Sequence, residues 1–211
     1  MRLAFDIDDT IYDTCNIDKK LRDRIEKEIE GREFKDNFER GISICTITRK
    51  YRQEMETWNN PDWVIPEAVK ALEDYIEKNP DTELYIVTAR YVKNKKWFDT
   101  LLSKTKLKVP HNRIFMYDYD LTKAQICMLN NIDILIDDAT ENFMEHRELV
   151  KSNLAYKTNF IWYKNPSRLA KRDYMGYNNY RTSKAMKTHI MKDWTEFEGI
   201  MGEIEQWRLG E

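Results

Sequence analysis

The first apolar run of the chain ends in a group of carboxylates. Leu3–Phe5 is followed by Asp6, Asp8 and Asp9, and then by Thr10. A carboxylate can attack a phosphoryl group to form an acyl phosphate, which divides one difficult displacement into two easier ones. A second carboxyl group two residues further on can protonate the leaving alkoxide. The spacing predicts phosphoryl transfer, with Asp6 as the nucleophile and Asp8 as the general acid and base.

Residues that suit the same chemistry stand at the ends of later apolar runs. They are Thr88, Ala89 and Arg90 after one run, Lys123 at the start of a helical pattern, and Asp137 and Asp138 after another run. Magnesium prefers one or two carboxylates together with phosphate oxygens and water, which Asp6 and Asp137 would provide. The hydroxyl of Thr88, a backbone N–H at Ala89 and the ammonium of Lys123 can hold phosphoryl oxygens as charge shifts between them.

Each strand-end residue also has a plainer explanation. Thr88 could cap a helix, Lys123 could lie on the surface, and Asp137 with Asp138 could cap a helix over residues 139–150. The carboxylates after the first run could lie in a solvated turn, although three of them together favour a bound cation. Arg90 could bind a second anionic group of a substrate or form an ion pair with the aspartate cluster. The sequence leaves these two roles of Arg90 open.

Strands alternating with helices must position these side chains. Five apolar runs predict strands at Leu3–Asp6, Leu84–Thr88, Arg113–Tyr117, Ile134–Asp137 and Asn159–Tyr163. Helical patterns begin at Pro66, at Trp97, at a Thr122–Gln125 capping box and before Phe197. This alternation predicts an α/β fold with a parallel five-stranded sheet covered on both faces. Ligands of such sheets bind beyond the carboxyl ends of the strands.

One stretch, from about residue 14 to residue 60, has no strand pattern. Ile17, Leu21, Ile25 and Ile29 recur every four residues, which predicts helix. We therefore expect a catalytic core over residues 1–13 and 61–211 with a small helical cap inserted at residues 14–60. The aromatic residues of the insertion either form its own small core or cover the substrate.

Composition excludes several classes of protein. The chain has 211 residues, 41% hydrophobic and 34% charged residues, and a formal net charge of −2. It has no apolar run of membrane-spanning length and no pattern of a signal peptide at its start. Its three cysteines and three histidines are scattered, which argues against disulfides or a zinc site. A cytoplasmic enzyme is the expectation.

The motifs, taken in order, resemble those of the haloacid dehalogenase (HAD) superfamily of phosphohydrolases. The matching segments are Asp6-Ile-Asp8-Asp-Thr10, Leu84-Tyr-Ile-Val-Thr88, Lys123 and Ile136-Asp137-Asp138. Residues 121–142, Ile65–Ala68, Tyr163–Pro166 and Asp193-Trp194 look similar to the 5'(3')-deoxyribonucleotidase branch. Arg90 departs from that branch, which looks to carry a smaller residue there.

The resemblance implies a fold, a cofactor and a set of roles. The fold would be a Rossmann-like three-layer core with the cap after strand 1, and the cofactor would be Mg²⁺. Asp6 would be nucleophile and metal ligand, and Asp8 would be general acid and base with its backbone carbonyl on the metal. Asp137 would be a second carboxylate ligand, with Asp138 binding through water or supporting a ligand. The substrate would be a small phosphomonoester, with a nucleoside monophosphate favoured.

Two other functions stay open at this stage. Residues 164–192 are basic and contain tyrosines, which would suit a polynucleotide end-phosphatase with a single-strand track. A solvated excursion between sheet and final helix explains the same residues without nucleic acid. A regulatory module that binds phosphate or a nucleotide without turnover is the second alternative. No membrane partner is expected, and the oligomeric state is not predicted.

Overall fold

The structure is a computed structural model. It describes residues 1–13, 19–36, 39–40, 43–44, 46–47, 50, 64–90, 99, 102–103, 105–116, 121–139, 142, 157–166 and 188–209. The basic stretch from 167 to 187 and most of the helical pattern at residues 97–102 lie outside the described residues.

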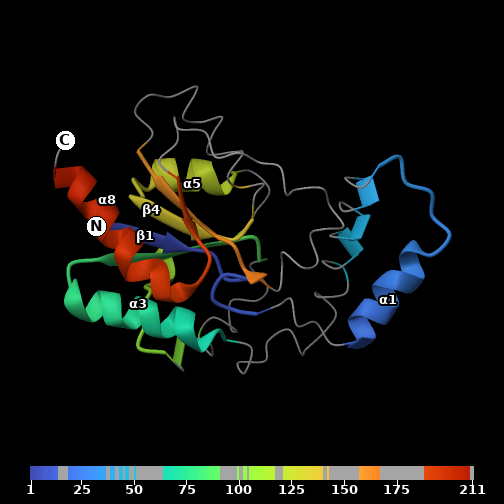
Figure 1. The fold of residues 1–211 in the computed structure, drawn as a ribbon, viewed down its shortest axis with the longest axis horizontal. Helices are drawn as coiled ribbons and strands as arrows, with labels where there is room; N and C mark the ends of the chain where they lie inside the picture. Colours follow the sequence, from blue (N-terminus) through green and yellow to red (C-terminus); the bar gives the residue numbers. More distant parts are fainter. Residues whose placement is uncertain are drawn as a thin grey trace.

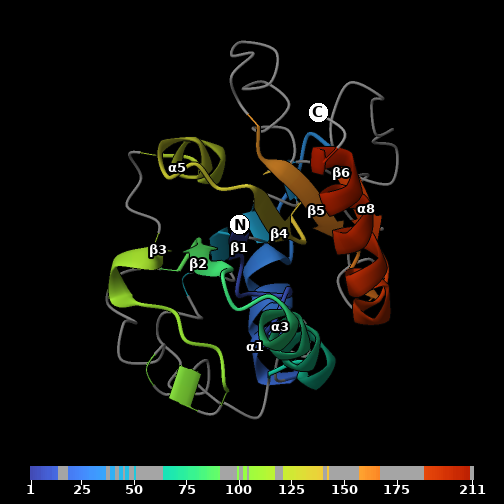
Figure 2. The ribbon, with the colours of Figure 1, turned by 90° about the vertical axis from the view of Figure 1, so that its left-hand side faces the viewer.

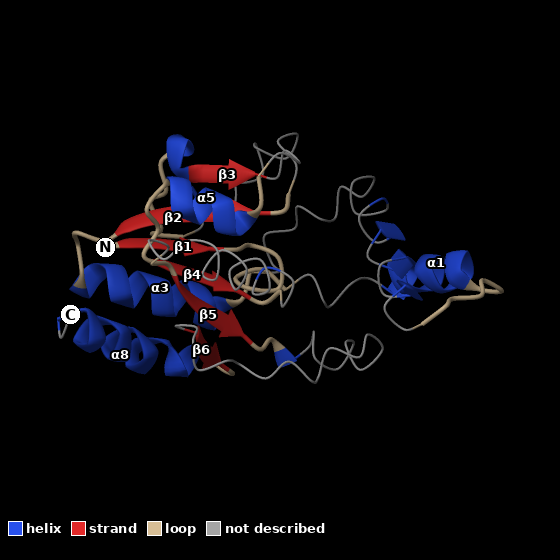
Figure 3. Cartoon of the chain, turned by 90° about the horizontal axis from the view of Figure 1, so that it is seen from above, coloured by secondary structure: helices blue, strands red, loops and turns tan. Residues whose placement is uncertain are grey.

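A parallel sheet forms the centre of the described part of the chain. Its six strands are β1 (Arg2–Phe5), β2 (Glu83–Thr88), β3 (Ile114–Met116), β4 (Ile134–Asp137), β5 (Asn159–Tyr163) and β6 (Thr188–Met191). They lie in the order β3-β2-β1-β4-β5-β6, and every neighbouring pair is parallel. Strands β2 and β3 are therefore added in turn on one side of β1. The chain then crosses to the other side of β1, where β4, β5 and β6 are added in turn. Figure 3 shows the strands running side by side with their carboxyl ends on one edge.

Helices cover both faces of this sheet, as the alternation predicted. Helices α3 (Pro66–Lys78) and α8 (Phe197–Leu209) lie on one face, and α5 (Lys123–Leu129) lies on the other (Figure 2). Side chains alternate across a strand, so Leu3 and Phe5 pack with the α3 and α8 side, whereas Ala4 packs with the α5 side. The result is the predicted three-layer α/β architecture.

The number of strands is a correction. The sequence predicted five, and β6 at the edge of the sheet is the sixth. Its residues Thr188–Met191 are half-buried except for Met191, which is fully buried. An edge strand of four residues with a histidine and a threonine lacks the continuous apolar run by which a central parallel strand is recognised.

The helix boundaries follow local signals. Pro66 begins α3 at a position where its missing N–H is not needed. The capping box of α5 is formed, with Gln125 N donating to Thr122 Oγ1 at 3.2 Å and Thr122 N donating to Gln125 Oε1 at 2.8 Å. On α8, Phe197, Met201 and Ile204 are buried against the sheet. These three predictions are confirmed.

Helix α1 (Lys19–Ile29) lies in the predicted insertion. Gly31, at φ 72°, follows it in the left-handed conformation that commonly ends a helix. Ile25 and Ile47 are buried together, with Ile29 and Ile44 against them. In Figures 1 and 3, α1 lies beyond the edge of the sheet where the strands end, apart from α3, α5 and α8. The assignment of residues 14–60 as a cap stays a prediction.

The chain leaves and re-enters the core through a short stalk, residues 11–13 and 64–65. Ile65 N donates to Ile11 O at 2.9 Å, and Tyr12 forms an antiparallel bridge with Val64. The stalk thus holds together the two ends of the segment that contains α1. None of the helices in the described ranges has the length and apolar character required to cross a bilayer.

Candidate active site

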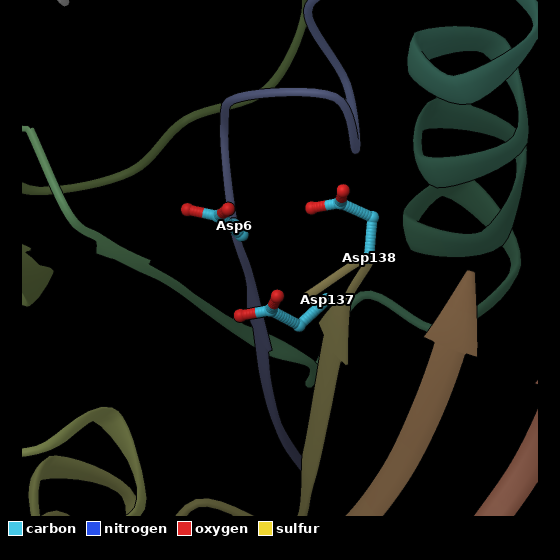
Figure 4. Close-up of side chains that lie close together, drawn as sticks. All are labelled: Asp6, Asp137 and Asp138. Carbon is cyan, nitrogen blue, oxygen red and sulfur yellow. The ribbon is translucent and has the colours of Figure 1, made fainter. Parts of the chain in front are cut away.

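The order of the strands places the topological switch point of the sheet at the carboxyl ends of β1 and β4. Connections leave these two neighbours toward opposite sides of the sheet, which separates the loops above them and favours ligand binding there. Asp6 follows β1 directly, Asp137 is the last residue of β4, and Asp138 comes next. Figure 4 shows the three side chains gathered at these strand ends.

A buried lysine joins two of these carboxylates. Lys123 is the first residue of α5, and its Nζ lies 2.9 Å from Asp6 Oδ1 and 2.7 Å from Asp137 Oδ2. The side chains of Lys123, Asp6 and Asp137 are 6%, 7% and 0% exposed. The surface-lysine alternative for Lys123 is therefore wrong, because its ammonium is held between two strand-end carboxylates.

Burial and neighbouring charge change the proton affinity of this group. Burial raises the pKa of Asp6 to about 7, which attraction to Lys123 limits and repulsion from Asp137 and Asp8 increases. Burial alone would lower the pKa of Lys123, but attraction to Asp137 and Asp6 outweighs it and raises that pKa above its usual range. Lys123 is thus a permanent cation, whereas ionised Asp6 is costly until more positive charge arrives.

The carboxylates suit a divalent cation. Asp6, Asp137 and Asp138 are all buried and offer oxygens within 4.8 Å of one another. Their combined charge exceeds that of Lys123, and a buried excess of negative charge is costly unless a cation offsets it. Carboxylate oxygens are hard ligands of the kind that Mg²⁺ takes. The residues therefore fit the metal that the sequence predicted, and Asp138 belongs to the group together with Asp6 and Asp137.

Asp137 is also fixed by its neighbours. Its Oδ2 accepts a hydrogen bond from Asn142 Nδ2 at 2.7 Å in addition to that from Lys123, and its Oδ1 accepts from Ala139 N at 2.7 Å. The last bond closes a local turn after β4, and the helix predicted over residues 139–150 lies almost entirely outside the described residues. Asn142 had no assigned role in the sequence.

Two hydrogen bonds hold Asp138 in place. Trp162 Nε1 donates to Asp138 O at 3.1 Å, and Thr10 Oγ1 donates to Asp138 Oδ1 at 3.4 Å. Thr10 is fully buried, so the threonine of the first motif connects the β1 loop to the end of β4. These contacts fix the position of the Asp138 carboxylate relative to Asp6.

Asp8 lies in the loop after β1, two residues beyond Asp6, and is bound by Arg90. Arg90 Nε donates to Asp8 Oδ2 at 2.9 Å and to Oδ1 at 3.1 Å, and Arg90 Nη2 donates to Oδ1 at 2.6 Å. The arginine side chain is 0% exposed and that of Asp8 is 20% exposed. Of the two roles left open for Arg90, the structure contains the ion pair with the aspartate cluster.

The remaining predicted phosphate-binding residues end β2. Thr88 is buried, its Oγ1 accepts from Arg90 N at 3.4 Å, and Ala89 beside it is exposed. The structure thus brings the ends of β1, β2 and β4 and the start of α5 to one rim, as the sequence predicted. The described histidines lie elsewhere, His111 beside Asp99 and His189 beside Glu203.

Besides Asn142, two supporting residues, Asn165 and Tyr12, were not predicted from the sequence. Asn165, in the loop after β5, is buried and donates from Nδ2 to Asp9 O at 2.8 Å. It holds the β1 loop where Asp9 adopts φ 60°, a left-handed conformation that aspartate tolerates better than most residues. Tyr12 is fully buried and its ring lies 5.0 Å from the Arg90 guanidinium carbon. A polar residue two positions after a predicted strand, as Asn165 is, was the available signal.

Comparison with known proteins gives structural matches alone. No sequence-family model and no curated protein sequence matches the chain. Solved structures that resemble it include a haloacid dehalogenase-like family hydrolase from Xanthomonas campestris, with TM-score 0.55, 11% identity and coverage of 100% of this chain and 98% of that one. An Entamoeba histolytica HAD hydrolase of family IA, variant 3, has TM-score 0.55, 16% identity and coverage of 97% and 99%. A haloacid dehalogenase-like hydrolase from Streptococcus pneumoniae has TM-score 0.52, 15% identity and coverage of 95% and 97%. The sheet order, the layers and these whole-length matches show that the chain has the Rossmann-like α/β fold of the haloacid dehalogenase-like hydrolases.

Proposed function

We propose that the protein is a magnesium-dependent phosphomonoester hydrolase that acts through an aspartyl-phosphate on Asp6. The observation that carries the proposal is the buried ion-pair group in which Lys123 lies between Asp6 and Asp137. A structural ion pair would need one carboxylate for one lysine, whereas this rim holds an excess of carboxylates. Such an excess suits a site that receives a cation and an anionic substrate together.

The first step would be attack by Asp6. Its carboxylate oxygen forms a bond to phosphorus, and the bond between phosphorus and the ester oxygen of the substrate breaks. Asp8 gives its proton to that ester oxygen, so the alcohol leaves neutral. Lys123 and the hydroxyl of Thr88 stabilise the negative charge on the phosphoryl oxygens during the transfer.

The second step would release phosphate. Asp8, now ionised, accepts a proton from a water molecule, whose oxygen attacks phosphorus and breaks the bond to Asp6. Inorganic phosphate leaves, Asp6 returns as a carboxylate, and Asp8 returns to its protonated form. One carboxyl group thus serves as acid and then as base, which suits its position two residues beyond the nucleophile.

The residues that would hold magnesium are Asp6 and Asp137, the backbone carbonyl of Asp8, and Asp138 directly or through water. The bound ion would supply positive charge that offsets repulsion between the carboxylates and the phosphate dianion.

The favoured substrate is a nucleoside monophosphate. This choice rests on the sequence resemblance of residues 121–142, Ile65–Ala68 and Tyr163–Pro166 to deoxyribonucleotidases. The polynucleotide end-phosphatase depends on the basic stretch 164–192, of which residues 167–187 lie outside the described part of the chain. No described contact favours it or the regulatory module.

Phosphate release from a panel of phosphomonoesters tests the proposal. The panel would contain ribo- and deoxyribonucleoside monophosphates, sugar phosphates and para-nitrophenyl phosphate, each assayed with Mg²⁺ and with excess chelator. We expect turnover with Mg²⁺ and its loss in chelator. Asp6→Asn should abolish turnover, whereas the control Asp133→Asn should retain it, because Asp133 binds Arg2 N at the amino end of β4.

The outcomes separate the alternatives. Full activity in chelator, or an Asp6→Asn variant within about tenfold of the parent, contradicts the mechanism. Turnover of sugar phosphates in preference to nucleotides retains the mechanism and overturns the nucleotide assignment. Absence of turnover on the whole panel, with nucleotide binding retained, favours the regulatory module.

A further inference from the structure

Arg90 is a buried charge placed between the β1 loop and the stalk. Its guanidinium meets Asp8 on one side, and its carbon lies 5.0 Å from the centre of the Tyr12 ring. It is among the largest fully buried side chains of the described residues. Burial removes water from the charge of an arginine, which is unfavourable in free energy. The contacts that offset this desolvation therefore indicate the role of the residue.

The contact with Asp8 fixes an orientation as well as a charge. Two guanidinium nitrogens, Nε and Nη2, reach the two oxygens of one carboxylate at 2.6–3.1 Å. This fork constrains the plane of the carboxylate, which a point charge would not do. The carboxylate that the proposed function uses as acid and base is therefore held in one place by Arg90.

The same geometry argues against direct binding of substrate by Arg90. The arginine side chain is 0% exposed, while that of Asp8 is 20% exposed. For Arg90 to bind a substrate anion with Nε or Nη2, the guanidinium would have to withdraw from Asp8. Asp8 would then lose the donors that orient its carboxyl group.

Tyr12 gives the arginine a second anchor, in the stalk. Tyr12 is fully buried, pairs with Val64 across the stalk, and forms a bridge with Asp8. A guanidinium against an aromatic ring at this distance is a favourable contact. Arg90 thus lies between the acid–base residue and the segment that connects the core to residues 14–60.

We propose that Arg90 is a positioning residue that orients the Asp8 carboxylate and ties it to the stalk through Tyr12, without contacting the substrate. The inference rests on the proposed function, because it assumes that Asp8 transfers protons. It predicts that Arg90 affects turnover through Asp8 alone.

A double-mutant cycle tests this dependence. Asp8→Asn, Arg90→Gln and the double variant would be assayed with an alkyl phosphate, whose leaving group needs protonation and which has no second anionic group. General acid–base catalysis contributes about a hundredfold or more, so Arg90→Gln should lower kcat by about tenfold to a hundredfold with KM changed by less than about threefold. In the Asp8→Asn background the same change should lower kcat by less than about threefold, because its target is gone. Multiplying losses would overturn the proposal.

Two further readouts separate positioning from other roles. Arg90→Lys keeps the charge but not the fork, so it should retain the fold and lose more kcat on an alkyl phosphate than on para-nitrophenyl phosphate. An Arg90→Lys variant with parental kcat on both substrates would overturn the proposal. So would a rise in KM confined to substrates with a second anionic group, which is the signature of substrate binding.

Arg113→Gln is the matched control. Arg113 also pairs with a carboxylate, Glu83, and lies over an aromatic ring, Tyr85, but at the amino ends of the strands. The Arg113→Gln variant should have a lower melting temperature than the parent, with little change in kcat. If the parent protein releases no phosphate from any substrate, the proposed function fails; if the parent is active but the cycle is additive, only the role of Arg90 fails.

Discussion

Replacement of Asp6 by asparagine should make the metal-free protein more stable while it abolishes turnover. The folded protein holds the pKa of Asp6 at about 7, against an ordinary value of 3.8. Between these two values the folded state binds a proton that the unfolded state does not. Stability of the parent therefore falls as pH rises from about 4 to about 7 and then levels off.

The size of the effect follows from the shift. At about pH 8 the ionised carboxylate destabilises the fold by at most about 4 kcal/mol. At about pH 5 the folded protein keeps Asp6 protonated while the unfolded chain has lost that proton, and this difference destabilises the fold by about 2 kcal/mol. An asparagine in the same space has no charge to bury, so Asp6→Asn should gain amounts up to these values. The gain should shrink when Mg²⁺ is added, because the ion stabilises the folded parent in proportion to its binding.

Urea unfolding in chelator at both pH values measures the difference. Asp133→Asn is the control, since that residue lies at the amino end of β4 beside Arg2 N. It should show no gain that grows with pH. A variant of Asp6 that is less stable than the parent in chelator at the higher pH would refute the argument, because it would mean that Lys123 more than offsets the burial of Asp6.

Three other outcomes follow from the site. Mg²⁺ should bind more tightly as pH rises from about 6 to about 8, with release of a proton from Asp6, which calorimetry in buffers of different ionisation enthalpy would detect; affinity independent of pH would contradict the raised pKa. Lys123→Met should lose turnover. In chelator at about pH 8 it should also lose stability, because Asp6 and Asp137 then repel each other without their lysine, and Mg²⁺ should partly restore that stability. Melting curves with and without the ion measure this. Asp9→Gly should keep stability and Asp9→Val should lose about 1–2 kcal/mol in denaturant titrations, since φ 60° strains a β-branched residue; equal stabilities would count against that strain.

The residues at the rim of the site were predictable because they stand at the ends of predicted strands. Asp6, Thr88 and Asp137 each stand where an apolar run stops, and parallel strands bring such positions to one edge. Lys123 lies within the capping box Thr122–Gln125, which the sequence predicts and the structure contains. These signals are local in the sequence, so they can be recognised without knowing how the helices and strands pack.

The contacts between these residues were not predictable in the same way. Whether Arg90 binds Asp8 or a substrate anion depends on where the end of β2 lies relative to the β1 loop, which no local pattern encodes. The same holds for Asn165, whose amide reaches Asp9 from the loop after β5, whereas Asn142 reaches Asp137 from only five residues further along the chain. Edge strand β6 escaped because its half-buried residues have little apolar periodicity.

The adjacency of β1 and β4 also governs when the site comes into being. Leu3 pairs with Ile134 and Phe5 with Ile136, so the nucleophile and its partner carboxylate come from the two ends of a long loop of chain. Contacts between residues so distant in sequence form slowly, because the entropy of loop closure opposes them. A growing chain that has made only β1, β2 and β3 holds Asp6 but neither Lys123 nor Asp137. The cation site is therefore a product of complete core assembly, and metal binding by this rim reports that the central strands have joined.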